Sequence, residues 1–169
     1  DVLAEQLRMI ANHGQRIKYH HAVIGCNSRL DTVQAAVLNA KLKHLDEYIV
    51  ARRKAADFYD QAFAENKFIT IPFRDGNNKH VFHQYTLTLN GVDRDGLNLY
   101  LAEQGVPSMI YYPVPAHRQK MFDAFGGSDF NLPVTDWLTE RVISLPIHTE
   151  LDEEQQTFIV NKVLEYINR

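Results

Sequence analysis

The chain has 169 residues, of which 45% are hydrophobic, 11% aromatic and 23% charged. This composition is typical of a folded globular protein and excludes a disordered chain, a collagen-like chain and a disulfide-rich scaffold. The formal net charge of −3 disfavours a general nucleic-acid binder. No apolar run approaches the ~20 residues of a membrane-spanning helix, so we expect neither nucleic acid nor membrane as a partner. The single cysteine, Cys26, cannot form an internal disulfide, which predicts a reducing, cytoplasmic location.

The first 66 residues have a helical pattern. A helix is predicted between Asp1 and Gly14, from apolar residues at helical spacing. Residues 13–27 form a polar connector, and a second helix is predicted from about residue 30 to Asn66, without Pro or Gly. At 1.5 Å per residue that helix would be roughly 50 Å long. A helix of such length joins domains, packs on a partner or breaks into two.

The pattern changes after Asn66 to short strands alternating with helices. Strands are predicted at 68–71, 81–89, 106–112 and 142–145, and a helix capped by Asp93 lies between the second and third. These make a strand–helix–strand unit, which is right-handed if its strands are parallel. Shorter helical pieces are predicted near 119–125 and 135–141, and a closing helix begins with a capping box of Asp152 and Gln155. The chain therefore divides into residues 1–66 and a small α/β domain of residues 67–169.

Two polar clusters precede the second predicted helix. His20 and His21 are adjacent, so their side chains diverge, and no partner lies at zinc-like spacing; we expect loop histidines and no metal. Asn27-Ser28-Arg29 allows two interpretations. An amide, a guanidinium and backbone N–H groups would suit a phosphate. Alternatively, Asn27 or Ser28 caps the helix while Arg29 pairs with a nearby acid.

A third cluster follows the strand predicted at 106–112. Tyr111, Tyr112 and His117 place two hydroxyls and an imidazole at the end of a strand, a favoured ligand position in α/β folds. The tyrosines could equally be packing residues with their hydroxyls at the surface. None of the eight lysines is an obvious buried nucleophile, and the sequence has no P-loop, GxGxxG or HExxH motif.

Three strings in the sequence resemble one family. Residues 13–48 read HGQRIKYHHAVIGCNSRLDTVQAAVLNAKLKHLDEY, which contains G-x-N-x-R-L-x-x-x-Q-A-A. Residues 112–117 read YPVPAH, and residues 144–148 read SLPIH. Together and in this order they are similar to the DegT/StrS family of pyridoxal-phosphate (PLP) sugar aminotransferases. The YHH…NSRLD version resembles members that act on 3-keto nucleotide sugars, such as those that make 2,3-diamino uronic acids.

The resemblance implies an α/β fold: the C-terminal part of an aspartate-aminotransferase-like (fold type I) enzyme, with a long connecting helix and a small domain. It implies a cytoplasmic homodimer with shared active sites, which moves an amino group from a donor such as glutamate to a nucleotide-sugar in lipopolysaccharide or other cell-surface glycan biosynthesis. Asn27 and Arg29 would bind the PLP phosphate across the interface. The substrate would be faced by Tyr19, His20, His21, Tyr111, Tyr112 and His117. Close relatives within the family have His-Tyr-Pro where this chain has Tyr111-Tyr112-Pro113.

The family's catalytic lysine has no counterpart in these residues, nor has the aspartate that pairs with the PLP ring nitrogen. The chain begins Asp1-Val2-Leu3, without an initiator methionine or a signal-peptide pattern, and the lysine position would lie upstream. We therefore expect no catalytic residue in the chain and no transaminase activity from these 169 residues alone. Two alternatives stay open: a PLP-dependent sugar dehydratase of the same family, and a non-catalytic binding or dimerisation module.

Overall fold

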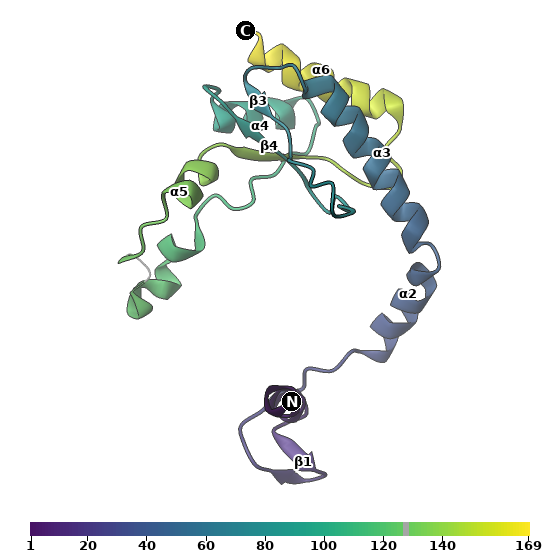
Figure 1. Ribbon diagram of the computed structural model, residues 1–169, viewed down its shortest axis with the longest axis vertical. Coiled ribbons are helices and arrows are strands. Elements are labelled where there is room, and N and C mark those ends of the chain that lie inside the picture. The colour runs from purple at the N-terminus through teal and green to yellow at the C-terminus, as the bar shows by residue number, and fades with distance from the viewer. Residues whose placement is uncertain (127–128) are drawn as a thin grey trace. The chain divides into compact units, whose positions relative to one another are not determined.

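A computed structural model describes residues 1–126 and 129–169 (Figure 1). The chain forms two compact units, residues 1–45 and residues 46–169. Each unit is described by itself below. Within the described residues, no helix is both long and apolar enough to cross a membrane.

The first unit is a helix, a small hairpin and a second helix. It contains α1 (Val2–Ala11), β1 (Gln15–Ile17), β2 (His20–His21) and α2 (Thr32–Leu42). The helix expected between Asp1 and Gly14 is confirmed. Among residues 1–45, all of which the structure describes, only Gly14 is buried. This unit therefore rests on backbone hydrogen bonds and has no apolar core.

Two glycines close the base of the hairpin. Gly14 has φ of +74°, and a Cβ built on it would lie 1.8 Å from the Val23 carbonyl oxygen. A Cβ on Gly25 would lie 2.1 Å from the Gly14 nitrogen. No side chain fits at such distances, so both positions require glycine.

The long helix predicted from about residue 30 to Asn66 is not continuous, and of the outcomes expected for such a length the break into two is the one found. It is two helices, α2 and α3 (Leu45–Phe63), separated by a tight turn in which the His44 N–H donates to the Lys41 carbonyl at 3.0 Å. Four residues of α3 are buried, whereas α2 buries none. Most helical stability in proteins comes from packing of an apolar face. Helix α3 therefore has the packing support within the described chain that α2 lacks.

The second unit is built on an antiparallel sheet with the order β3–β4–β5. Its strands are β3 (Ile69–Thr70), β4 (Tyr85–Leu89) and β5 (Val142–Leu145). The strand predicted at 81–89 begins later than expected. In place of the strand predicted at 106–112, the structure has one isolated antiparallel bridge, between Met109 and Ser144. Since β4 and Met109 are both antiparallel to β5, they run parallel to each other with β5 between them.

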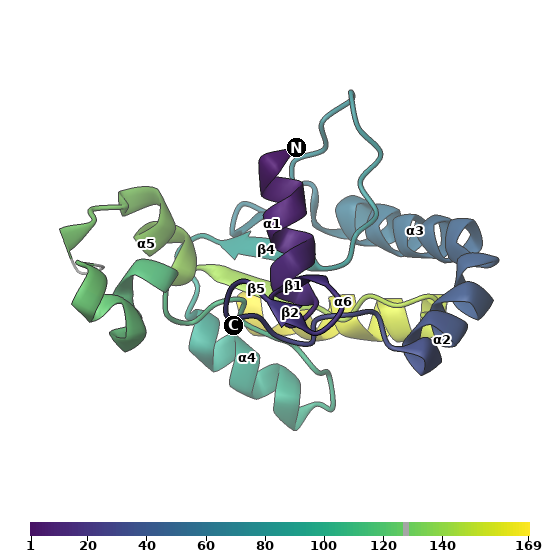
Figure 2. The same ribbon diagram turned by 90° about the horizontal axis from the view of Figure 1, so that it is seen from below.

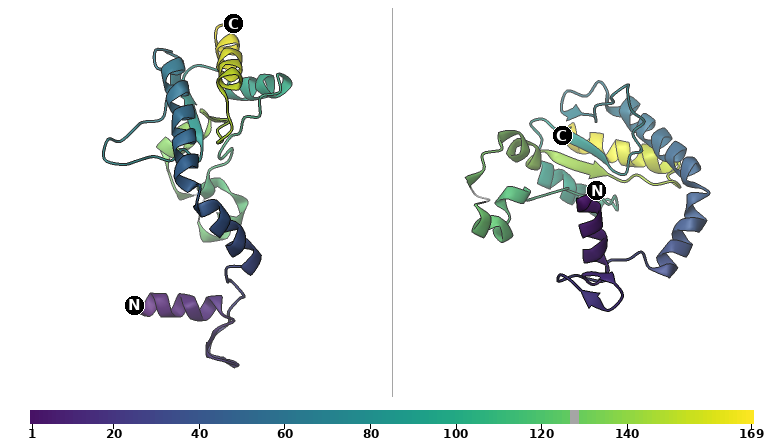
Figure 3. Two further views of the ribbon diagram at one scale, coloured as in Figure 1. Left: turned by 90° about the vertical axis from the view of Figure 1, so that its right-hand side faces the viewer. Right: turned by 60° about the horizontal axis from the view of Figure 1, so that its bottom comes forward.

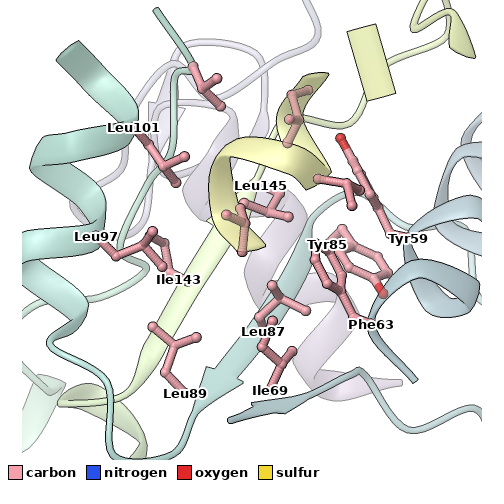
Figure 4. Close-up of a cluster of buried hydrophobic side chains, with 14 of the residues drawn as sticks. Tyr59, Phe63, Ile69, Tyr85, Leu87, Leu89, Leu97, Leu101, Ile143 and Leu145 are labelled. Carbon is pink, nitrogen blue, oxygen red and sulfur yellow. The ribbon is translucent and has the colours of Figure 1, made fainter. Parts of the chain in front are cut away.

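Three helices cover one face of this sheet: α3, α4 (Arg94–Glu103) and α6 (Glu153–Ile167) (Figures 1 and 2). Figure 4 shows Leu97 of α4 and Phe63 of α3 reaching toward the same strands from two sides. Gln156 of α6 donates to the Ala55 carbonyl of α3 at 3.2 Å. The core is made of alternate strand residues and these helix residues, including Tyr59, Tyr85, Leu87, Leu89, Leu101, Ile143, Leu145 and Val163.

The caps of α4 and α6 follow the prediction. Asp93 accepts a hydrogen bond from the Gly96 N–H, and Asp152 with Gln155 forms a complete capping box. The described residues between 116 and 139 include the short 3₁₀ helices η1 (Ala116–Arg118) and η2 (Lys120–Phe125), and the helix α5 (Pro133–Thr139). The helical pieces expected near 119–125 and 135–141 thus exist, with shifted bounds.

Candidate functional site

The predicted site residues of the first unit lie on and beside the hairpin. Tyr19 is 78% exposed, and His20 and His21 are exposed on β2. The His21 Nδ1 lies 2.7 Å from the His13 carbonyl oxygen. Since a carbonyl only accepts, Nδ1 carries the proton, and Nε2 remains available to a ligand.

Asn27 lies at the base of the same hairpin. It forms an antiparallel bridge with Asn12, and the neighbouring Cys26 carbonyl accepts from the His13 N–H at 3.0 Å. The backbone before Arg29 is thereby fixed to the end of α1, because the Ser28 N–H donates to the Ala11 carbonyl at 3.0 Å. The hairpin and the Asn27–Arg29 segment are parts of one local structure.

The helix-cap interpretation of Asn27-Ser28-Arg29 is wrong. The N-cap of α2 is Asp31, whose Oδ1 accepts from the Val33 N–H at 2.7 Å and from the Gln34 N–H at 3.4 Å. Arg29 is exposed and forms no ion pair with any residue that the structure describes. An unpaired guanidinium beside an amide is a suitable donor set for the oxygens of a phosphate.

Tyr111 lies in the second unit and lines a cavity of about 170 Å³ on the sheet face away from the helices. The wall includes Met109, Ser144 and Ile147. The Ser144 and Thr86 hydroxyls are 2.8 Å apart on that face. Tyr112 is 73% exposed, and its ring centroid lies 6.1 Å from that of Tyr111.

His117 has a different environment. It is 9% exposed, and its Nε2 lies 3.2 Å from Asp136 Oδ1, while Arg118 donates to Asp136 Oδ2 at 3.0 Å. The hydrogen bond from Arg118, followed by the influence of His117, lowers the pKa of Asp136 below its usual value. His117 also lines a second cavity, of about 320 Å³, with Phe122, Phe125 and Phe130. The structure does not bring His117 into the cavity that Tyr111 lines.

Two cavity residues were missed from the sequence. His83 and Gln84 line the Tyr111 cavity, but the pattern placed them inside a strand of residues 81–89. The strand begins only at Tyr85, after Phe82, whose φ is +48°. The signal in the sequence was the polar His-Gln pair, which interrupts the apolar alternation just before the strand.

The described residues contain neither a metal-binding group nor, in the two cavities, a lysine nucleophile. They contain no group of three or more His, Cys, Asp or Glu side chains that could hold a metal ion. In the described part of the chain, no lysine lines either the Tyr111 cavity or the His117 cavity. These residues offer groups for recognition: an exposed amide and guanidinium in one unit, and a cavity lined by Ser144 and Tyr111 in the other.

Comparison with known proteins gives the family. The model of the DegT/DnrJ/EryC1/StrS aminotransferase family matches residues 1–164. The chain belongs to this family. The resemblance noted in the sequence is thereby confirmed.

Relatives share both sequence and fold with this family member. It is 41% identical over 152 residues to a UDP-2-acetamido-2-deoxy-3-oxo-D-glucuronate aminotransferase of Pseudomonas aeruginosa, covering 90% of this chain and 41% of the relative. The crystal structure of DesV from S. venezuelae in complex with a ketimine intermediate matches with a TM-score of 0.87 and 35% identity, over 99% of this chain and 44% of DesV. NtdA from Bacillus subtilis with bound cofactor PMP matches with a TM-score of 0.86 and 25% identity, over 100% of this chain and 40% of NtdA.

The chain thus spans less than half the length of these relatives. The predicted fold class is confirmed: the mixed α/β structure is that of the C-terminal part of a fold type I PLP enzyme.

Proposed function

We propose that the chain acts as part of a PLP-dependent aminotransferase, which moves an amino group from glutamate to the keto carbon of a nucleotide-linked sugar for a cell-surface polysaccharide. Support comes from the family membership and from the P. aeruginosa relative, whose name gives a 3-oxo UDP-sugar as substrate. The observation that carries the proposal is the Asn27–Arg29 segment, which caps no helix and has an unpaired guanidinium.

In this proposal Asn27 and Arg29 hold the phosphate of PLP. The guanidinium would offer its N–H donors to the phosphate oxygens, and the amide of Asn27 would offer a further donor. When bound, PLP supplies the electron sink that amino-group transfer needs. The chain's own part is to fix the position of the cofactor, so that the sugar carbonyl approaches it in one geometry.

We propose sugar-nucleotide contacts for the predicted residues of each unit, taken separately. Tyr19, His20 and the free Nε2 of His21 offer hydrogen-bonding groups on the hairpin, and Tyr111 offers a hydroxyl in its cavity. Tyr112 and His117 complete the proposed set. A nucleotide-sugar, which has many hydroxyls and two phosphates, suits such mainly neutral and cationic donors.

We also propose a homodimer with shared active sites. Helices α1 and α2 expose apolar side chains that the chain itself does not cover, among them Leu3 at 68%, Leu38 at 53% and Leu42 at 65%. Exposed apolar patches of this kind mark association surfaces. Asn27 pairs with Asn12 at the end of α1, so a partner packed on α1 would lie next to Asn27.

The complete gene product, supplied with PLP, glutamate and a UDP-3-keto sugar, tests the proposal. We expect 2-oxoglutarate and a 3-amino sugar as products. Arg29→Ala should weaken PLP binding by about 10- to 100-fold, since hydrogen bonds to charged groups contribute about 1.5–3 kcal/mol. Arg8→Ala, an exposed arginine in the last turn of α1, is the matched control and should leave PLP affinity unchanged.

Three outcomes would overturn parts of this proposal. Release of a dehydrated sugar without 2-oxoglutarate would indicate the dehydratase. Absence of any PLP-dependent reaction would favour a binding module. Equal PLP affinity in wild type and Arg29→Ala would remove Arg29 from the phosphate site.

A further inference from the structure

Arg52 of α3 binds three backbone carbonyls at once. Its Nη1 lies 3.1 Å from the Phe82 oxygen, 3.3 Å from the His83 oxygen and 3.2 Å from the Ile147 oxygen. Phe82 and His83 belong to the loop that leads from β3 to β4, and Ile147 follows β5. A single side chain thus joins two segments that are far apart in the sequence.

These two segments are walls of the Tyr111 cavity, since His83 and Ile147 both line it. The ladder between β4 and β5 ends at the pair Tyr85 and Leu145. Beyond that pair no strand partner is available, and backbone carbonyls there need another donor. Arg52 supplies it, and so continues the connection between the two walls past the end of the sheet.

The loop depends on such support. It extends away from the sheet between β3 and β4 (Figures 2 and 3). Phe82 within it has φ of +48°, a left-handed conformation that a phenylalanine rarely adopts and that persists only where the surroundings hold it. The Arg74 guanidinium also lies 4.6 Å from the centroid of the Phe82 ring.

Helix α3 also makes a second contact with the wall that follows β5. The Tyr59 hydroxyl donates to the Pro146 carbonyl at 2.9 Å, and Pro146 also lines the cavity. Arg52 and Tyr59 are two turns apart on α3, so they share one face of the helix. One rigid helix therefore sets the position of both walls.

We infer that Arg52 is a positioning residue for the sugar-binding cavity: it fixes the spacing between His83 and Ile147 and thereby the shape that the nucleotide-sugar meets. This inference rests on the proposed function, because it takes the Tyr111 cavity as part of the substrate site. Arg52 touches no substrate in this view. Its effect is exerted through the backbone that it holds.

The test compares KM and kcat of the complete enzyme with a UDP-3-keto sugar as substrate. Arg52→Ala should raise KM for the nucleotide-sugar about tenfold and change kcat by less than about threefold. Arg52→Lys should restore KM to within about threefold of wild type, since one ammonium carries three donors and all three contacts here come from one nitrogen. Affinity for PLP should stay unchanged in both variants.

Arg94→Ala is the matched control. Arg94 Nη1 also donates to a backbone carbonyl, that of Thr139 at 2.8 Å, and its side chain is 11% exposed, but it lines no wall of the Tyr111 cavity. We expect a lower melting temperature with unchanged KM. If Arg52→Ala behaves in the same way, the inference is overturned while the proposed function stands. If the wild type transfers no amino group, the proposed function itself fails.

Discussion

The Tyr85 hydroxyl forms a hydrogen bond with a carboxylate beside the core. It donates to Asp60 Oδ1 at 2.6 Å, and Arg74 Nη2 lies 2.6 Å from the other oxygen of Asp60. Tyr85 has no exposed surface. Burial first, and then the hydrogen bond to Asp60, raises the pKa of Tyr85 above its usual value of 10. A phenol in this position is held neutral, and it ties β4 to α3.

Replacing Tyr85 with phenylalanine should lower the free energy of unfolding by about 1–2 kcal/mol at neutral pH, because Asp60 loses a hydrogen-bond donor. The folded pKa is raised, so the contribution of Tyr85 is fully present below pH 10 and is lost as the unfolded chain ionises above it. The difference between wild type and Tyr85→Phe should therefore shrink above pH 10. Urea denaturation at pH 7 and at pH 11 measures both effects.

Tyr19→Phe serves as the control for this comparison, because Tyr19 is 78% exposed. It should change stability at neither pH. A Tyr85→Phe variant as stable as wild type at pH 7 would show that the hydroxyl of Tyr85 contributes nothing net.

At the scale of elements, α6 depends on its first residues. Asp152 accepts from the Gln155 N–H at 2.8 Å, and the Asp152 N–H donates to the Gln155 side chain at 3.2 Å. Asp152→Ala should destabilise the protein by about 1 kcal/mol, as for other N-cap replacements. Asn161→Ala, on an exposed position of the same helix, should cost far less. Chemical denaturation compares the two, and equal losses would contradict the importance of the cap.

The elements that the sequence predicted are those with local signals. The cap of Asp152 and the alternation of Tyr85, Leu87 and Leu89 depend on neighbouring residues, so these elements could be read directly. The position of the break between α2 and α3 could not be read, because residues 30–66 contain no Pro or Gly to mark it.

The residues of the candidate site also differ in whether the sequence could predict them. Asn27, Arg29 and the hairpin histidines form a local sequence pattern, and the cap at Asp31 excludes only the helix-cap interpretation of Asn27-Ser28-Arg29. His83 was not predicted as a site residue. It lines the same cavity as Tyr111 only because of the register of β4 on β5 and the bridge at Met109. Long-range contacts of this kind leave no periodic signal in the sequence.

At the scale of the whole molecule, the two units should differ in stability. The buried apolar residues all lie in residues 46–169 for the described part of the chain, and the first unit buries Gly14 alone. Regions with little burial open at low free-energy cost. In the 169-residue chain, amides of α1 and α2 should exchange hydrogen at least about tenfold faster than those of β4 and β5.

Hydrogen exchange followed by mass spectrometry measures this difference by segment. Helix α3 provides the internal control, since it is helical like α2 but buries Ala55, Ala56, Tyr59 and Phe63. Equal protection in α1 and β4 would mean that the first unit has tertiary support of its own.

The two glycines at the base of the hairpin have a consequence for how this protein can diversify. Gly14 and Gly25 close the base of the loop from residue 14 to residue 25 by backbone contact, and the His21 side chain adds a hydrogen bond to the His13 carbonyl. The closure therefore does not depend on the side chains of residues 17–20, which can be exchanged in evolution without moving Asn27 or Arg29. Substitution at the tip should therefore change the groups that the hairpin presents while the backbone that carries Asn27 and Arg29 keeps its place.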